Sequence, residues 1–411
     1  MAGRVESVLG LLLAASCVAI ATKWIRVPYT VALVLFGLAV HFIPFAPRIE
    51  LTGSLVMLIF LPALLFEAAW NLDFANLKPI WQPMVVLATA GVGISVAVVG
   101  AFAHFSFGLT WPLAFLLGAI LSATDPVSVV ALFKNLRAGK SFATLIEAES
   151  LFNDGTGVVV FGILLAGVLA GTAVQPAAAL GTFVWVSVGG LLVGTGAGFV
   201  ASQITRAFDD HLLEIMLTTI VAYGSFVLGQ HLAVSPVLAV VAAGIVMGTF
   251  ARGRTISARS AEAIDAFWEY AAFVANSLLF LLVGLRIDPR PLVALWVPLA
   301  WVVAGLLVAR GIVIFGFLPL LRSQRPPVRQ WPTLFWGGLR GALSIALALS
   351  LPDQIADRTL LIALVFGCVL FTLVVQGLTM PLVLQVCHPS DPESPPQEVA
   401  APAQNLRPPP I

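Results

Sequence analysis

Charged residues are scarce in this chain of 411 residues. Asp, Glu, Lys and Arg together make up 10% of it, whereas soluble domains carry roughly a quarter. Apolar residues make up 60%, and the mean hydropathy is +1.02. Such a chain lacks the polar side chains to cover a water-exposed surface, so a soluble globular fold is excluded and lipid must act as solvent. The net charge of +1 also leaves no basic patch for a nucleic-acid partner.

Cysteine and the common catalytic motifs are scarce as well. Cys17, Cys368 and Cys387 are dispersed within or beside apolar runs, which favours neither a disulfide framework nor a metal site. The chain has no HExxH motif and no phosphate-binding glycine loop with a lysine, so metalloproteases and nucleotide-driven pumps are disfavoured and no cofactor is expected. Five dispersed histidines are predicted to be mostly interfacial: His41, His104, His211, His231 and His388.

Apolar stretches long enough to cross a bilayer recur along the chain, separated by short breaks that hold proline, glycine or charge. The first is followed by Lys23, Trp24 and Arg26 and by no small-residue cleavage site, which indicates a membrane helix and not a signal peptide. Thirteen stretches are predicted to be membrane helices: 7–22, 29–46, 52–70, 82–107, 112–136, 143–171, 180–206, 213–231, 235–251, 263–286, 292–321, 333–351 and 358–387.

The distribution of Lys and Arg predicts the orientation. With thirteen spans and an external N-terminus, thirteen of these side chains fall in inner loops and five on the outer side, as the positive-inside rule requires. We therefore expect a membrane domain at 1–387 with its N-terminus outside. Residues 388–411, which are rich in Pro, Ala, Ser, Gln and Glu, are expected to form a disordered cytoplasmic tail.

An odd number of spans permits two inverted repeats. Six helices at 7–171 and six at 213–387 would flank a linker helix at 180–206. The sequence therefore predicts an all-α polytopic membrane protein of about thirteen transmembrane helices in two inverted six-helix repeats.

The fifth helix of each repeat is interrupted. The first, 112–136, contains Thr124-Asp125-Pro126, and the second, 333–351, contains Gly337-Gly338, Arg340 and Gly341. Interrupted helices at matching positions of two repeats are the best sequence indication of a transport site.

Charged side chains inside membrane spans cost about 2.5–3.5 kcal/mol each on insertion scales, and they mark functional or paired positions. Asp125 precedes Pro126, which removes one backbone donor and frees carbonyl groups of the preceding turn. A carboxylate beside free carbonyls suits a small cation, whereas the structural alternative is a proline-kinked helix with Asp125 turned toward a water-filled crevice. The leading intramembrane charges are Glu67, Asp125, Glu147, Glu149, Asp154, Arg310 and Arg340.

The segment 147–155 opens the sixth span. Helical spacing places Ser150 and Asp154 on one face, and Glu149 and Asn153 on an adjacent face. A position in the first turns, favoured by the helix dipole, explains Glu147 equally well. Asp154 lies about two turns further, so the same explanation does not suffice for it.

The two intramembrane arginines remain charged, so each requires an anion or a hydrated cavity. The favoured interpretation is structural ion pairs that tie helices together. We propose Glu149 with Arg310 and Glu67 with Arg340, while the exchanged pairing stays open.

These motifs, taken together, resemble the bacterial branch of the sodium/proton exchanger family, the electroneutral antiporters of the monovalent cation:proton class. One motif alone would be weak, whereas five in this order on a thirteen-span plan are specific. The resemblance rests on the runs Leu61 to Glu67, Ala123 to Val127, Glu147 to Gly155, Phe267 to Gly284 and Gly338 to Ala342.

The resemblance implies more than the spacing shows. Thr124 and Asp125 would lie where two broken helices cross, and Asp154 would face them and bind Na+ or protons in competition. Glu149 and Ser150 would help to form the site, and Asn153 is typical of the electroneutral branch.

The family also suggests how the molecule is assembled. Its members are homodimers that move a core domain against a dimer scaffold, here expected in the bacterial inner membrane. Many carry a soluble regulatory domain after the last span, whereas the tail here has only about two dozen residues, so regulation of that kind is in doubt.

The sequence therefore predicts a transporter and not an enzyme. It would exchange Na+, or Li+ or K+, for H+ one for one, which is electroneutral exchange, with Asp125 and Asp154 as the Na+ ligands. The first alternative is a monovalent cation channel, which needs a continuous polar pore. The second is an intramembrane aspartyl protease, whose Gly-x-Gly-Asp context is missing here.

Overall fold

The computed structural model describes residues 2–24, 27–42, 51–72, 74–125, 140–321 and 325–387. In these ranges the regular elements are helices, apart from one isolated bridge between Arg252 and Ile256. The predicted tail at 388–411 and the part of the fifth span that follows Asp125 lie outside the described residues.

Helices follow one another along the whole described chain. The first part contains α1 (Ala2–Thr22), α2 (Tyr29–His41), α3 (Gly53–Leu55), α4 (Leu61–Trp70), α5 (Phe74–Leu77), α6 (Trp81–Ala88), α7 (Ala90–Phe107), α8 (Trp111–Ile120) and α10 (Lys140–Ala170). The second part contains α11 (Pro176–Ile204), α12 (His211–His231), α13 (Pro236–Val246), α14 (Ala258–Arg286), α15 (Pro289–Ala294), α16 (Trp296–Gly311), α17 (Trp331–Trp336), α18 (Ala342–Leu349), α19 (Arg358–Phe371) and α20 (Gly377–Cys387). Short π-helical turns extend several of them, among them η8 (Thr372–Gln376).

Every predicted stretch contains helix. Eight described helical stretches are long and apolar enough to cross a membrane, judged by length and composition. Four shorter apolar helices coincide with four further predicted spans: Val8–Thr22, Tyr29–His41, Trp111–Ile120 and Pro236–Ala251. The remaining prediction, 333–351, corresponds to the short helices α17 and α18 with a break between them. The all-α, multi-pass architecture is therefore confirmed.

Several predicted boundaries are wrong by a few residues. The helix α10 begins at Lys140 and not at 143, and α14 begins at Ala258 and not at 263. The expected linker helix 180–206 runs from Pro176 to Ile204. The cause is that the added turns are polar, so they fall outside the apolar runs from which the spans were predicted. At the start of α14, for example, Ser257 is the N-cap and accepts a hydrogen bond from the Ser260 amide at 3.3 Å.

Glycines bring pairs of helices close together. A Cβ atom at Gly190, Gly194 or Gly198 of α11 would meet backbone atoms of α13 or of the residue before it, so these glycines allow α11 and α13 to pack closely. Gly37 of α2 and Gly284 of α14 face each other in the same way. Bulky substitutions there would separate the helices.

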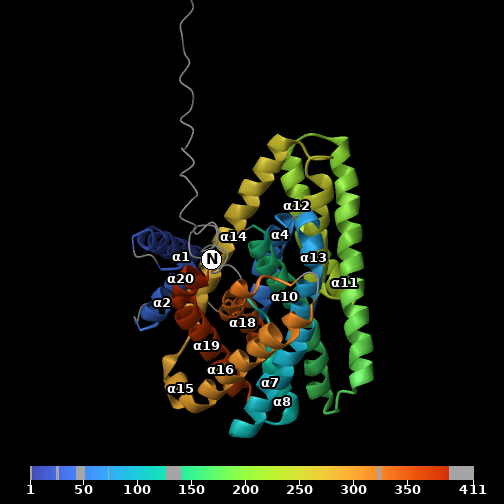
Figure 1. Ribbon diagram of the computed structural model, residues 1–411. Coiled ribbons are helices and arrows are strands. Elements are labelled where there is room, and N and C mark those ends of the chain that lie inside the picture. Colours follow the sequence, from blue (N-terminus) through green and yellow to red (C-terminus); the bar gives the residue numbers. More distant parts are fainter. Residues whose placement is uncertain are drawn as a thin grey trace, which may run out of the picture.

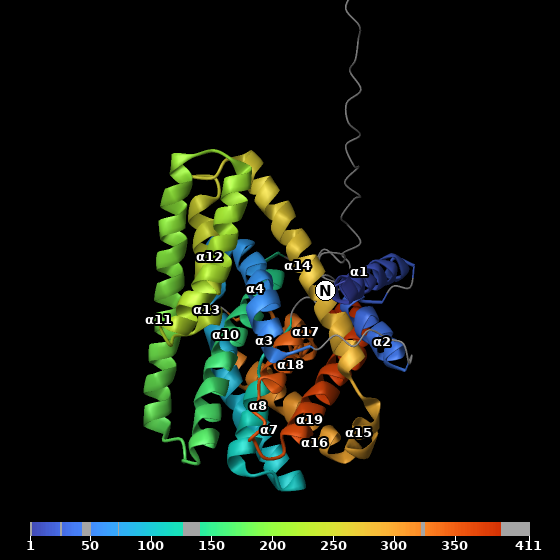
Figure 2. The same cartoon turned by 180° about the vertical axis from the view of Figure 1, so that it is seen from behind.

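The first half of α10 lies in the middle of the molecule, where it packs against α4, α6, α8 and α13 (Figure 1). The long helix α11 follows one edge, and α1 and α2 lie at the opposite side in both views (Figures 1 and 2). Two helices stop inside this bundle: α8 ends at Ile120, and 121–125 are not helical, while 337–341 separate α17 from α18. These two breaks position the candidate site.

Candidate ion-binding site

The two helix breaks are hydrogen-bonded to each other. The backbone N–H of Asp125 donates to the carbonyl of Leu339 at 2.8 Å. In return, Nη1 of Arg340 donates to the carbonyls of Ser122 at 2.6 Å and Ala123 at 3.0 Å. Backbone groups that a broken helix leaves without intrahelical partners are thus satisfied by the other break, which allows irregular backbone at membrane depth.

The helix α10 presents polar side chains to the first break. The hydroxyls of Ser150 and Thr124 are 3.0 Å apart. The Asn153 amide donates to the Ser122 carbonyl at 3.1 Å and to the Thr124 hydroxyl at 3.4 Å. Asn153 is therefore a support for the non-helical segment.

A cavity of about 110 Å³ lies where the breaks and α10 meet α4 and α14. Its polar side chains come from five segments of the chain: Glu67, Thr124, Asp125, Glu147, Ser150, Asp154, Asn276 and Ser344. The rest of the wall is mainly apolar, with leucine prominent. Four carboxylates thus share one cavity, and the described residues of its lining include neither Lys nor Arg.

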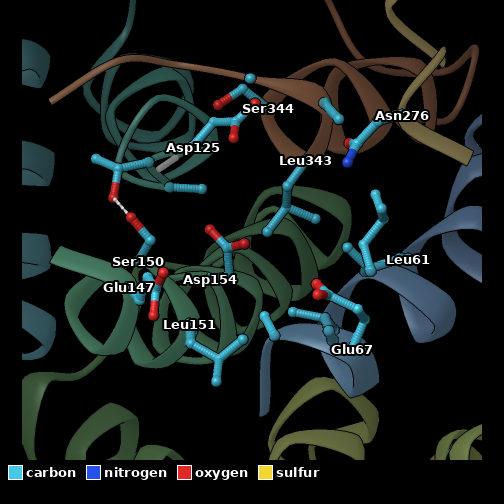
Figure 3. A pocket seen from close by; sticks show the side chains of 17 residues that line it. Leu61, Glu67, Asp125, Glu147, Ser150, Leu151, Asp154, Asn276, Leu343 and Ser344 are labelled. Atoms are coloured by element: carbon cyan, nitrogen blue, oxygen red, sulfur yellow. Dashed lines mark hydrogen bonds between the residues drawn. The ribbon is translucent and has the colours of Figure 1, made fainter. Parts of the chain in front are cut away.

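Asp125 and Asp154 face the cavity from opposite sides. Asp125 lies beside Ser344 on the side of the helix breaks, and Asp154 projects from α10 toward it (Figure 3). The Oδ1 atom of Asp154 is buried and has no hydrogen-bond partner among the described residues. Together with the hydroxyls of Ser150 and Thr124, the two aspartates form a set of hard oxygen donors, which suits a small cation.

Gly341 allows this position of Asp125. A Cβ atom at residue 341 would overlap the carboxylate of Asp125. The glycine in the second break is therefore required by the close approach of the first break.

Glu149 and Arg310 form a buried ion pair, as predicted. One guanidinium nitrogen contacts Oε1 of Glu149, and Nη2 donates to Oε2 at 3.1 Å. Arg310 also donates to the Leu334 carbonyl from Nε at 3.0 Å and Nη2 at 2.8 Å. The pair ties α10 to α16 and α17. Neither residue lines the cavity.

The predicted pair of Glu67 and Arg340 is wrong. Arg340 is 3% exposed, and its guanidinium binds the carbonyls of the first break; no ion pair joins it to Glu67 in the described part of the chain. Glu67 lines the cavity instead, and its Oε1 accepts from the Asn71 amide at 2.9 Å. The physical reason is that free carbonyls at a helix break carry partial negative charge, so a buried arginine needs no carboxylate there.

Four cavity residues were not recognised from the sequence as part of the site: Glu67, Glu147, Asn276 and Ser344. Because α10 begins at Lys140, Glu147 lies two turns inside the helix and not in its first turns. Its spacing of three from Ser150 and seven from Asp154 places it on their face, a signal that was available in the sequence. Asn276 and Ser344 carried no local signal of this kind.

This arrangement defines a class of protein. A polytopic all-α membrane protein in which two non-helical segments meet beside clustered carboxylates has the architecture of a secondary transporter. Residues 11–386 match the family model described as sodium/hydrogen exchanger, transmembrane. The chain belongs to this family, as the motifs predicted.

Two curated relatives show how far the likeness extends. The chain is 42% identical over 368 residues to the low-affinity Na+/H+ antiporter NhaS1 of Synechocystis sp., an alignment that covers 88% of this chain and 69% of that protein. It is also 42% identical over 366 residues to the Na+/H+ antiporter ApNhaP of Aphanothece halophytica, covering 88% and 70% respectively.

Solved structures show the same fold. Two structures of the sodium proton antiporter MjNhaP1 from Methanocaldococcus jannaschii superpose with TM-scores of 0.71 and 0.74 at 22% identity. The first covers 92% of this chain and 99% of its own, and the second covers 93% and 97%.

Proposed function

We propose that this protein exchanges Na+, or the related Li+ or K+, for H+ across the membrane. The observation that carries the proposal is that Asp125 and Asp154 face one cavity at the crossing of two helix breaks. The relatives that are described as Na+/H+ antiporters support the same activity.

The proposed mechanism is competition for one site. Two carboxylates in a cavity with mainly apolar walls repel each other, so the pair is stable only when a cation or protons reduce its charge. Na+ and H+ therefore displace one another from Asp125 and Asp154. A site whose charge is balanced crosses a dry barrier more easily than a bare anionic one, because burying uncompensated charge is costly. The two fluxes are thereby coupled without a cofactor.

Other residues divide into ligands and supports in this proposal. The hydroxyls of Thr124 and Ser150 join the aspartates in binding the ion. Glu149 and Asn153 position the site, because their side chains contact Arg310 and the first break and not the cavity.

The architecture that goes with this mechanism is a pair of inverted repeats. We propose thirteen spans, with repeats at 7–171 and 213–387 and the linker helix near 180–206. The helix found at each predicted stretch supports the count, and the breaks in the fifth helix of each half support the repeat. The N-terminus would lie outside and the tail at 388–411 in the cytoplasm of a bacterial cell, following the positive-inside rule.

The proposed assembly is a homodimer in the inner membrane, in which the domain that carries the breaks moves against a scaffold. The contact surface in this scheme is the outward face of α11, which exposes large apolar side chains such as Leu180, Trp185 and Leu192. Chemical crosslinking of the protein in native membranes tests this assembly.

A cation channel is the remaining alternative, since membership of the exchanger family removes the protease. The clustering of four carboxylates in one cavity favours a carrier. A carrier saturates and needs a counter-ion, whereas a channel conducts one ion alone.

The experiment that tests the proposed function is Na+-driven proton movement in proteoliposomes with a trapped pH-sensitive dye. Wild-type protein should give a saturable signal, and Asp125→Asn and Asp154→Asn should each abolish it. The matched control is Asp353→Asn, because the Asp353 side chain is 96% exposed. Gel filtration and thermal melting of each variant establish that it is folded. Near-normal flux in either aspartate variant would exclude the assigned site.

A further inference from the structure

A second, much smaller cavity lies behind the crossing of the two breaks. It measures about 10 Å³ and is separate from the ion cavity, with which it shares no lining residue. Its polar lining comes from Arg310, Arg340, Thr372 and Gln376, and apolar side chains of α16, α17 and α19 form most of the remaining wall. The π-helical turn η8 runs from Thr372 to Gln376 and supplies two of these residues.

Two polar atoms in this wall lack a protein partner. Nε of Arg340 and Oε1 of Gln376 are buried and make no hydrogen bond to any described residue. The two side chains belong to residues that are 3% and 2% exposed. One is a donor and the other an acceptor, and leaving either unsatisfied in a low-dielectric interior is unfavourable.

We propose that this cavity binds one water molecule, which accepts a hydrogen bond from Arg340 Nε and donates one to Gln376 Oε1. A volume of about 10 Å³ is close to the smallest space that holds a buried water. The site also offers the polar partners that such a water requires.

The bound water gives Gln376 a defined role. Nη1 of Arg340 holds the carbonyls of Ser122 and Ala123, which directly precede the ion-site residues Thr124 and Asp125. The backbone of Arg340 is anchored separately, through its N–H to the Thr372 hydroxyl at 3.1 Å. The water and Gln376 orient the guanidinium from the other side. Gln376 is therefore a positioning residue that acts on the ion site through Arg340.

The test compares Gln376→Met with Gln376→Glu. Methionine keeps the length of the side chain and removes the acceptor oxygen, whereas glutamate keeps an acceptor for the water. The first readout is a high-resolution density map of the wild-type protein and of Gln376→Met. We expect a water peak between Arg340 and Gln376 in the wild type and its loss in Gln376→Met.

The second readout is transport, and it rests on the proposed function. For Gln376→Met we expect the KM for Na+ to rise about two- to tenfold, the effect of one lost hydrogen bond, with the maximal rate retained. Gln376→Glu should keep a KM near that of the wild type. A structural role without influence on the ion site would lower the melting temperature and leave KM unchanged.

The outcomes separate the two proposals. A wild-type map in which Gln376 contacts Arg340 directly, or in which an ion occupies the cavity, would overturn the water site whatever the transport result. Equal KM values for wild type and Gln376→Met would overturn the positioning role. Failure of wild-type exchange would overturn the proposed function and leave the density test of the water site intact.

Discussion

The N–H of Asp125 donates to the carbonyl of Leu339 at 2.8 Å, so this aspartate of the proposed ion site is held by backbone 214 positions further along the chain, between α17 and α18. Arg340, the next residue, returns two bonds to the carbonyls before Asp125. The two breaks thus form one unit, and a change in either one should alter the geometry of the ion site. The following predictions derive from this unit and from the side chains around it.

Removal of Arg310 should destabilise the protein. Arg310→Ala leaves Glu149 buried, at 2% exposure, without its cation, which costs about 3–5 kcal/mol. We expect a lower melting temperature in detergent together with lower yield. The double variant Glu149→Ala/Arg310→Ala should recover part of the loss, because no uncompensated charge remains.

Arg290→Ala is the control for that experiment, because Arg290 is exposed. If Arg310→Ala melts like the control, the Glu149–Arg310 pair has no structural role.

Glu67 should behave as a cavity residue and not as the partner of Arg340. Glu67→Gln removes a negative charge from the cavity, so we expect the KM for Na+ to rise by about tenfold while the melting temperature stays near that of the wild type. Arg340→Ala should destabilise, because it releases the carbonyls of Ser122 and Ala123.

The double variant Glu67→Gln/Arg340→Ala tests whether Glu67 and Arg340 form an ion pair. Glu67→Gln should not restore the stability of Arg340→Ala, whereas the Glu149 and Arg310 changes should compensate one another. If the double variant of Glu67 and Arg340 recovers melting temperature relative to Arg340→Ala, the two residues do form an ion pair, contrary to the structure.

Gly341→Ala should impair exchange with little effect on expression. The added methyl group would overlap the Asp125 carboxylate, and relief of such overpacking costs about 1–3 kcal/mol. We expect the exchange rate to fall by about tenfold as Asp125 moves away from its position in the cavity. Gly162→Ala on α10 is the control, because a Cβ atom there meets nothing within 4 Å. Equal rates in the two variants would show that the position of Asp125 tolerates this displacement.

Exchange should be insensitive to membrane potential. Arg310 neutralises Glu149, and Asn153 next to Asp154 does not titrate, so neither changes the charge that moves. If one Na+ replaces one proton at the aspartates, and Glu67 and Glu147 in the same cavity keep their charge, the site carries equal charge in both directions. The measurement is the initial rate in liposomes clamped at different potentials with K+ and valinomycin. A clear dependence on potential would refute the one-for-one stoichiometry and leave antiport itself intact.

The spans and the breaks were predictable from the sequence because both have local causes. Apolar runs of membrane length give the helices, and glycines together with Asp125-Pro126 mark the interruptions. The division of α10 into two polar faces was also predictable, since helical spacing alone places Ser150 and Asp154 apart from Asn153.

Contacts between helices that are distant in the sequence were harder to predict. Glu67 was assigned to Arg340 by elimination among buried charges, which treats carboxylates as the only partners for a guanidinium. The structure satisfies Arg340 with carbonyls of Ser122 and Ala123, and such backbone partners have no signature in the side-chain sequence. Asn276 was placed in the cavity only by the packing of α14 against the rest of the bundle.

The central claim is that Na+ and H+ compete for Asp125 and Asp154, and the most direct test is the KM for Na+ as a function of pH. The pH should be equal on both sides of the liposome membrane, and the exchange rate should be followed with radioactive Na+. Because protons compete with Na+, we expect the KM to rise as the pH falls, approaching about tenfold per pH unit, while the rate at saturating Na+ stays constant. A KM that does not change with pH, with a maximal rate that falls instead, would contradict competition at a shared site.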